Sequence, residues 1–151
     1  MTEQCHSWTL LAGRILLAPI FLLSGVMKIM NWPKTAESMA NEGMIAVPFF
    51  LFMAIVFEIG GGLLVLLGFK ARLGAAALVV FLIPATLIFH DFWTFQSPAR
   101  ESQMQHFMKN LTIMGGLLTL AAAGAGRFSL DALCCRGAPA DTRKELAEAA
   151  T

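Results

Sequence analysis

Four long apolar runs divide the chain, and charged, proline or aromatic residues bound each of them. An α-helix needs about 20 predominantly apolar residues to cross the roughly 30 Å hydrocarbon core of a bilayer. The runs therefore predict an all-α fold, an integral membrane bundle of four spanning helices. The predicted spans cover residues 8–29, 47–68, 72–89 and 107–124.

The segments between the runs predict how the helices connect. Only residues 69–71 separate the second span from the third, so these two helices must be antiparallel neighbours. After the first span, Pro33 suits the first turn of a helix and Gly43 suits its end. This pattern predicts a short amphipathic helix on the membrane surface, with Trp32 as its interfacial anchor. Residues 91–106 are polar and aromatic, and they predict a loop over one mouth of the bundle.

The composition agrees with a single membrane domain. Of the 151 residues, 57% are hydrophobic and 14% are charged, which leaves too little polar surface to cover a soluble domain of this size. The formal net charge is +1 and the basic residues are dispersed, which excludes a nucleic-acid partner. The predicted partner is the lipid bilayer. We expect one domain over residues 8–133, followed by a polar cytoplasmic tail over residues 134–151.

The basic residues also predict an orientation, because Lys and Arg in short loops are retained on the cytoplasmic side. More of them lie on the side of the two termini (Lys70, Arg72, Arg127, Arg136, Arg143 and Lys144) than on the other side (Lys28, Lys34, Arg100 and Lys109). Both termini are therefore predicted to lie in the cytoplasm.

Two charged residues lie inside the predicted spans, where each costs about 2.5 to 3.5 kcal/mol on insertion scales. Arg14 lies about two turns into the first span and Glu58 lies near the middle of the second. The long guanidinium side chain predicts an ion pair between them. That pair either fixes the register of the helices or leaves Glu58 a functional role, and the sequence does not decide between these readings. Residues 60–62, all glycine, predict close helix packing beside Glu58.

A second group of polar residues is predicted at the outer mouth, where three spans converge. Lys28 ends the first span, His90 follows the third, and Lys109 with Asn110 begins the fourth. Together they could hold a quinone carbonyl or a small oxyanion. The alternative is that they are ordinary residues of the headgroup region.

No metal site or disulfide is predicted. His90 and His106 are separated by the predicted loop, and neither has a second histidine one turn away. Cys5, Cys134 and Cys135 lie outside the spans and form no C-x-x-C pair.

With these features in place, the chain resembles the DoxX family of small four-helix membrane proteins, over residues 11 to 133. The resemblance rests on the order and spacing of four segments: GRILLAPIFLLSGVMKI at 13–29, EIGGGLLVLLG at 58–68, HDFW at 90–93 and FMKNLTIMGGLLTLAAAGAGRFSLD at 107–131. The family pattern points to Arg14, Ser24, Gly25, Lys28, Glu58, His90, Lys109, Asn110 and Asp131.

The resemblance implies a bacterial inner-membrane protein linked to oxidation chemistry, because relatives include subunits of quinone-coupled thiosulfate oxidation. The family also includes a member associated with a superoxide dismutase and a sulfurtransferase. The first hypothesis is therefore a membrane subunit of a quinone-linked, oxidative-stress or sulfur-related redox system, with quinone as cofactor and soluble redox proteins as partners. No self-contained catalytic motif is present. The alternatives are a non-enzymatic anchor for soluble partners and a small-solute transporter, which would have to form a homo-oligomer.

Overall fold

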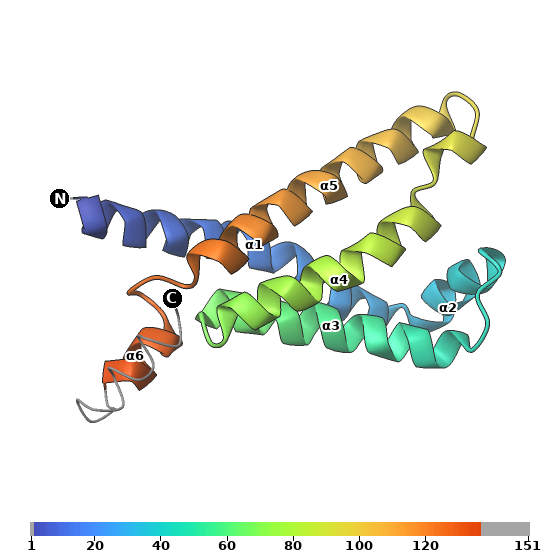
Figure 1. Ribbon diagram of the computed structural model, residues 1–151. Helices are drawn as coiled ribbons and strands as arrows, with labels where there is room; N and C mark the ends of the chain where they lie inside the picture. The colour runs from blue at the N-terminus through green and yellow to red at the C-terminus, as the bar shows by residue number, and fades with distance from the viewer. Residues whose placement is uncertain (1, 137–151) are drawn as a thin grey trace.

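The fold is all-α, as predicted, in a computed structural model that describes residues 2–136 (Figure 1). The polar tail predicted over residues 134–151 lies outside the described residues from 137 onward. The elements are α1 (Thr2–Met30), α2 (Trp32–Asn41), α3 (Val47–Leu67), α4 (Ala71–Phe89), the 3-10 helix η1 (Phe92–Thr94), α5 (Ala99–Ala123) and α6 (Leu130–Arg136).

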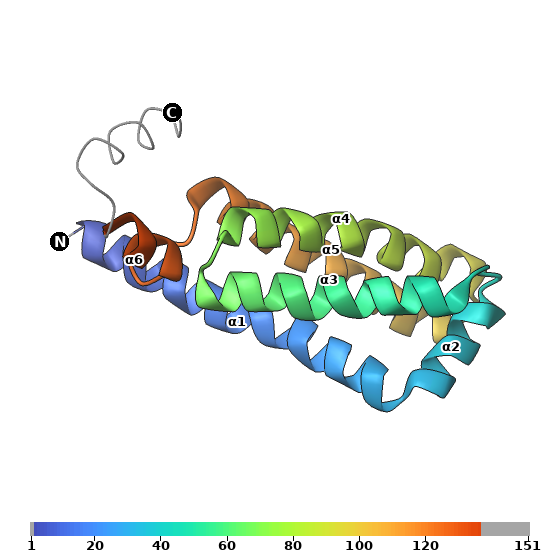
Figure 2. The ribbon, with the colours of Figure 1, turned by 90° about the horizontal axis from the view of Figure 1, so that it is seen from below.

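The four long helices run side by side (Figure 2). α3 packs between α1 and α4, and α5 packs mainly on α4 and more lightly on α1. The predicted antiparallel pairing of α3 and α4 is confirmed. The main core contains Phe21 of α1, Val65 of α3, Leu78 of α4 and Leu117 of α5, all nearly or fully buried. One core therefore joins the four helices.

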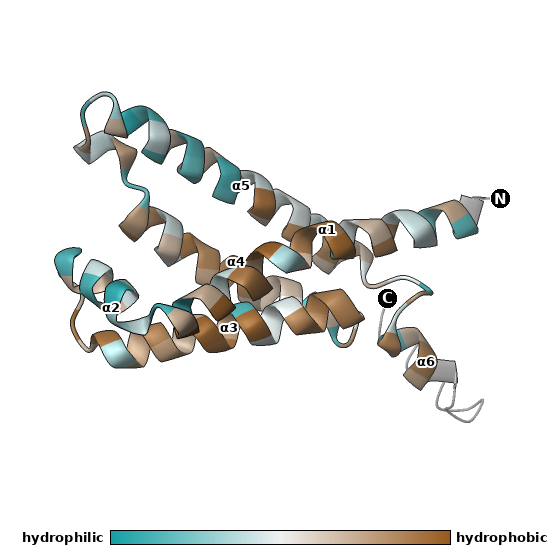
Figure 3. Cartoon of the chain, turned by 180° about the vertical axis from the view of Figure 1, so that it is seen from behind, coloured by the Kyte–Doolittle hydropathy of each residue, from teal (hydrophilic) through white to brown (hydrophobic). Residues whose placement is uncertain are grey.

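Within residues 2–136, three helices are long and apolar enough to cross a membrane: residues 4–30, 47–67 and 71–94. α3 and α4 match the predicted second and third spans within a residue or two. α5 is not among the three, because the polar residues of its N-terminal half lower its mean hydropathy, as Figure 3 shows by colour. The fourth crossing, over residues 107–124, therefore stays a prediction.

The start of the last long helix differs from the prediction. α5 begins at Ala99, so much of the loop predicted over residues 91–106 is helical. Pro98 occupies the N-cap position, where a missing N–H costs no helical hydrogen bond. The polar residues after Pro98 are good helix formers that carry no apolar pattern, which is why hydropathy missed them.

The short helix predicted after the first span is confirmed as α2, with Pro33 in its first turn, and its place on the membrane surface stays a prediction. Gly43 follows its end with φ +76°, a conformation that favours glycine. α2 packs on α3 through a second buried cluster of Met39, Leu51 and Ile55, against which Trp32 is partly buried. This helix closes the end of the bundle where α1 and α3 meet it (Figure 1).

Glycines bring the helices together as predicted, with one exception. A Cβ on Gly61 of α3 would lie 2.7 Å from Leu78 Cγ of α4, and one on Gly62 would lie 2.9 Å from Leu22 Cδ2 of α1. No atom lies within 4 Å of a Cβ built on Gly60. Two of the three glycines therefore serve close packing.

The segment after α5 folds back onto the turn between α3 and α4. Asp131 of α6 accepts from the backbone N–H of Lys70 at 2.8 Å and of Ala71 at 3.4 Å, and its own N–H donates to Gly68 O at 3.0 Å. These are free N–H groups at the start of α4, so the carboxylate acts as a helix cap from a distant segment.

Replacing Asp131 with alanine removes this contact and is expected to lower the local stability of the turn between α3 and α4 by about 1 kcal/mol, the usual effect of losing a helix cap. Hydrogen–deuterium exchange should then speed up at residues 69–71 and 129–134 and stay unchanged in the middle of α3. Asp131→Asn, which keeps one acceptor oxygen, should show a smaller change. Equal exchange in the alanine variant and the wild type would contradict this role.

Candidate functional site

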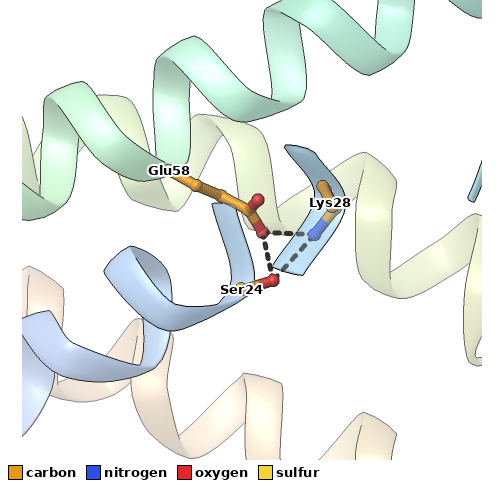
Figure 4. A network of polar contacts seen from close by, with 3 residues as sticks. All are labelled: Ser24, Lys28 and Glu58. Carbon is orange, nitrogen blue, oxygen red and sulfur yellow. Dashed lines mark hydrogen bonds and ion pairs between the residues drawn. The ribbon is translucent and has the colours of Figure 1, made fainter. Parts of the chain in front are cut away.

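A buried polar network joins α1 to α3 in the half of the bundle that α2 covers. Glu58 is 4% exposed, and its Oε1 accepts from Lys28 Nζ at 2.8 Å and from Ser24 Oγ at 2.9 Å. Lys28 Nζ also donates to Ser24 Oγ at 2.7 Å. Figure 4 shows the three side chains meeting at one carboxylate oxygen. The Lys28–Glu58 pair is therefore stabilised both by the attraction of opposite charges and by hydrogen bonds.

Local helix geometry explains why this network forms. Ser24 and Lys28 are four residues apart on α1, so they share one face and reach the same point on α3. Gly25 lies between them, and a Cβ there would lie 2.6 Å from Ile59 Cγ1. The missing side chain lets α1 approach α3 closely enough for Lys28 to reach Glu58.

The second oxygen of Glu58 has a different environment. Oε2 is buried and has no hydrogen-bond partner among the residues that the structure describes. An unsatisfied buried acceptor costs about 1 to 3 kcal/mol, and more when it is charged. Such an atom in a native fold points to a donor that arrives with a ligand or a water.

A pocket of about 330 Å³ lies next to this network. Its apolar wall includes Phe21, Phe81, Leu82 and Phe89. Its polar lining comes from α1, α2, α3, α5 and the residue that follows α4, and it comprises Ser24, Lys28, Thr35, Ser38, Glu58, His90, Lys109 and Asn110. The combination of an aromatic wall and convergent polar groups is typical of a small-molecule site.

The pocket brings together five of the six candidates named from the sequence: Lys28, Glu58, His90, Lys109 and Asn110. Residues from α1, from α5 and from the end of α4 therefore meet at one pocket, while its place at an outer mouth of the membrane stays a prediction. Glu58, which the sequence placed apart from that mouth, belongs to the same site, because Lys28 folds back onto it.

Arg14 lies elsewhere, and the predicted Arg14–Glu58 ion pair is wrong. Arg14 is 1% exposed and its Nη2 donates to Phe128 O, in the segment that precedes α6. Ten residues separate Arg14 from Ser24, or about 15 Å along the helix axis. Glu58 faces the later position, so Lys28 is its partner. Arg14 instead packs over Gly68, where a side chain would collide with the guanidinium.

The far side of the pocket is built by α4 and α5. Asn110 Nδ2 donates to the buried Thr86 Oγ1 at 3.0 Å. His90 Nδ1 lies 2.8 Å from Gln103 Oε1, and because a carbonyl oxygen only accepts, Nδ1 is the donor. The His90 ring stacks on the His106 ring with centroids 5.1 Å apart. The chain thus folds back through η1 and brings His90 and His106 into contact, although the loop predicted between them placed them apart.

Lys109 is held on the outer side of this stack. Its Nζ lies 3.3 Å from His106 Nδ1. Partial burial, with the nearby charge of Lys109 and the His90 ring, lowers the pKa of His106, which precedes the predicted fourth span. An uncharged His106 ring can accept from the ammonium group, so the low pKa and the contact agree.

Sequence reasoning missed Thr35, Ser38, Gln103 and His106 at this end of the bundle. Thr35 and Ser38 lie on α2, which was predicted only as a surface helix. Gln103 and His106 fell in the predicted loop. The spacing of Ser24 and Lys28 is the one signal that could have been read further, because residues four apart share a helix face.

Within residues 4–134, whose side chains the structure describes, no group of three His, Cys, Asp or Glu side chains could hold a metal ion. Cys5 and Cys134 are exposed free thiols. The side chain of Cys135 lies outside the described residues.

Comparison with known proteins decides the family. The DoxX family model matches residues 9–91, more than half of the chain. This protein belongs to the DoxX family. The matched part of this DoxX protein contains Ser24, Lys28, Glu58 and His90, and it ends before Lys109 and Asn110.

Two relatives from Escherichia coli are named inner membrane proteins. YphA is 33% identical over 122 residues, which cover 81% of this chain and 87% of the relative. YqjF is 37% identical over 123 residues, or 82% and 89% of the two chains. A Surfeit locus protein 4 homolog of Schizosaccharomyces pombe is 34% identical, but the match covers only 36% of that longer protein. No solved structure gives a significant match. These relatives and the apolar helices identify this DoxX protein as an integral membrane protein.

Proposed function

We propose that this DoxX protein is the quinone-binding membrane subunit of a redox system. The observation that carries the proposal is the pocket between the helices, where an aromatic wall meets the Lys28–Glu58 pair, His90 and Asn110. A quinone head group is a flat ring with two oxygens at opposite ends. Its ring suits Phe21, Phe81 and Phe89, and its oxygens need polar partners within an otherwise apolar site.

In this proposal, the chain binds and orients the head group, and a separate soluble redox protein exchanges its electrons. When bound, a quinone supplies the two-electron chemistry that the side chains lack. Glu58 and His90 are the groups in the pocket that can hold a proton beside the ring oxygens. Lys28 fixes the carboxyl group of Glu58 in position through the short contact at Oε1.

The proposed setting is the inner membrane of a bacterium, with four crossings and both termini in the cytoplasm. The names of YphA and YqjF support the membrane, and the excess of basic residues on the side of the termini supports the orientation. In that orientation, the pocket lies in the outer half of the bilayer, which a lipid-soluble quinone reaches from within the membrane.

Binding of a quinone to the protein in lipid nanodiscs tests the proposal. We expect saturable binding of duroquinone in at least one of its two oxidation states, measured by equilibrium dialysis against empty nanodiscs. His90→Ala should weaken binding about tenfold, because it removes one polar contact worth roughly 1.4 kcal/mol. His6→Ala, which changes an exposed histidine at the other end of α1, is the matched control.

If the folded wild-type protein shows no saturable binding of either the oxidised or the reduced quinone, the proposal is wrong. A non-enzymatic anchor for soluble partners would then be the better description. If the His90→Ala variant binds as tightly as the wild type, the quinone head group does not contact His90 and does not lie at the predicted mouth of the bundle.

A further inference from the structure

The pocket is lined by a buried residue, Glu58, with one hydrogen-bond acceptor that no described residue satisfies. Glu58 Oε2 is buried and without a partner among the described residues. Asn110 uses an N–H on Thr86, which leaves its carbonyl oxygen free in the contacts described. His90 donates through Nδ1 to Gln103, so in the uncharged ring Nε2 remains an acceptor.

Several donors of the pocket are used by its own residues. Lys28 directs two of its three N–H bonds at Glu58 Oε1 and Ser24 Oγ. The hydroxyl of Ser24 donates to the same Glu58 oxygen. Lys109 directs one N–H at His106. The donors nearest Glu58 hold its Oε1 and leave Oε2 without one, so a ligand that presents only acceptors could not satisfy that oxygen.

The two oxidation states of a quinone differ in this respect. The oxidised ring carries two carbonyl oxygens, which only accept, and one of them beside Glu58 Oε2 would set two acceptors against each other. The reduced ring carries two hydroxyl groups, and each can donate one hydrogen bond. A hydroxyl can satisfy Oε2 with a charge-assisted bond, which is about twice as strong as a neutral one.

We infer that the pocket is a site for the reduced, dihydroxy form of the quinone, with one ligand hydroxyl donating to Glu58 Oε2. The inference rests on the proposed quinone-binding function and adds which form the site selects. Lys28 and Ser24 act as positioning residues, because both hold Oε1 and so leave Oε2 as the oxygen without a partner. Selection follows from an acceptor that would otherwise stay buried and unpaired.

The test compares three probes that differ in their donors: duroquinol, duroquinone and the dimethyl ether of duroquinol. They are titrated into the full-length protein in lipid nanodiscs under anaerobic conditions, which keep the quinol reduced. We expect duroquinol to bind at least about tenfold tighter than either of the other two, a loss typical of an unpaired buried acceptor. The ether shares the reduced ring and lacks the O–H groups, so it isolates the hydrogen bond.

Two variants sharpen the test. Glu58→Gln should reduce the preference for the quinol to about threefold or less. The NH2 group of the new side chain can donate a hydrogen bond to a carbonyl oxygen of the oxidised quinone. Glu42→Gln makes the same change at an exposed site after α2, and it should keep the wild-type preference. The comparison of probes on the wild type stands even if Glu58→Gln does not fold.

The possible results separate the two proposals. Duroquinone that binds as tightly as duroquinol, or better, overturns the inference and leaves the quinone-binding function standing. An ether that binds as tightly as the quinol also overturns it, because Oε2 would then need no donor from the ligand. Failure of both the quinone and the quinol to bind overturns the proposed function itself.

Discussion

Replacing Lys28 with methionine is expected to lower the free energy of unfolding by about 3 kcal/mol, the lower end of what breaking a buried ion pair costs. Glu58, whose side chain is only 5% exposed, would lose the cation beside its carboxyl group. The lower end applies because 24% of the Lys28 side chain is exposed, so solvent compensates in part. Titration with SDS in mixed micelles, followed by circular dichroism, measures the change.

Two companion variants separate the charge effect from the loss of packing. Lys28→Met combined with Glu58→Gln should recover most of the lost stability, because no charge remains unpaired. Lys34→Met removes an exposed lysine of α2 and should change the stability by less than about 0.5 kcal/mol. If the double variant were as unstable as the sum of its single variants, the ion pair would not be the cause.

Replacing Gly74 with valine is expected to cost about 3 kcal/mol, the upper end for overpacking, because α3 and α4 would have to separate. The first added carbon would lie 2.7 Å from Leu64 Cβ and 3.2 Å from Gly61 O. Neither neighbour is the end of a flexible side chain, so rotamer changes cannot relieve the contact. The same micelle titration gives the loss.

Gly60→Val is the matched control on the facing helix, since no atom lies within 4 Å of a Cβ at that position. It should alter stability by less than about 1 kcal/mol, within the range of helix propensities. Equal destabilisation by both substitutions would mean that any side chain at these positions is harmful and that the close contact of α3 with α4 is not special.

The two substitutions affect different parts of the molecule. Gly74 lies with Gly61 at the crossing of α3 and α4, while Lys28 and Glu58 join α1 to α3 beside the pocket. The Gly74 variant should therefore lose stability throughout the bundle. The Lys28 variant should also alter binding at the proposed quinone site, because it releases the Glu58 carboxyl group that lines the pocket.

Much of the fold could be predicted from the sequence because hydropathy and length act locally. The apolar runs identified α3 and α4 within a residue or two, and Pro33 with Gly43 identified α2. The start of α5 could not be found in this way. Its first turns are polar and carry no apolar stripe, so their helical state depends on propensity and on packing against η1.

The site was predicted in part, for a related reason. The order of the spans brought Lys28, His90, Lys109 and Asn110 to one mouth, because antiparallel helices alternate their ends. The partner of Glu58 could not be chosen in the same way. Arg14 and Lys28 lie on the same helix, and the choice between them depends on how far α1 slides along α3 and on the space that Gly25 provides.

The sequence by itself determined an all-α membrane protein, the places of its apolar helices and the chemical types of the residues near its mouth, because these follow from composition and local pattern. The tertiary structure decided which charges meet. It paired Lys28 with Glu58, sent Arg14 to Phe128, and left one oxygen of Glu58 without a partner among the residues described. Pairings of this kind depend on distances of a few ångströms between helices, which only the packing of the whole bundle sets.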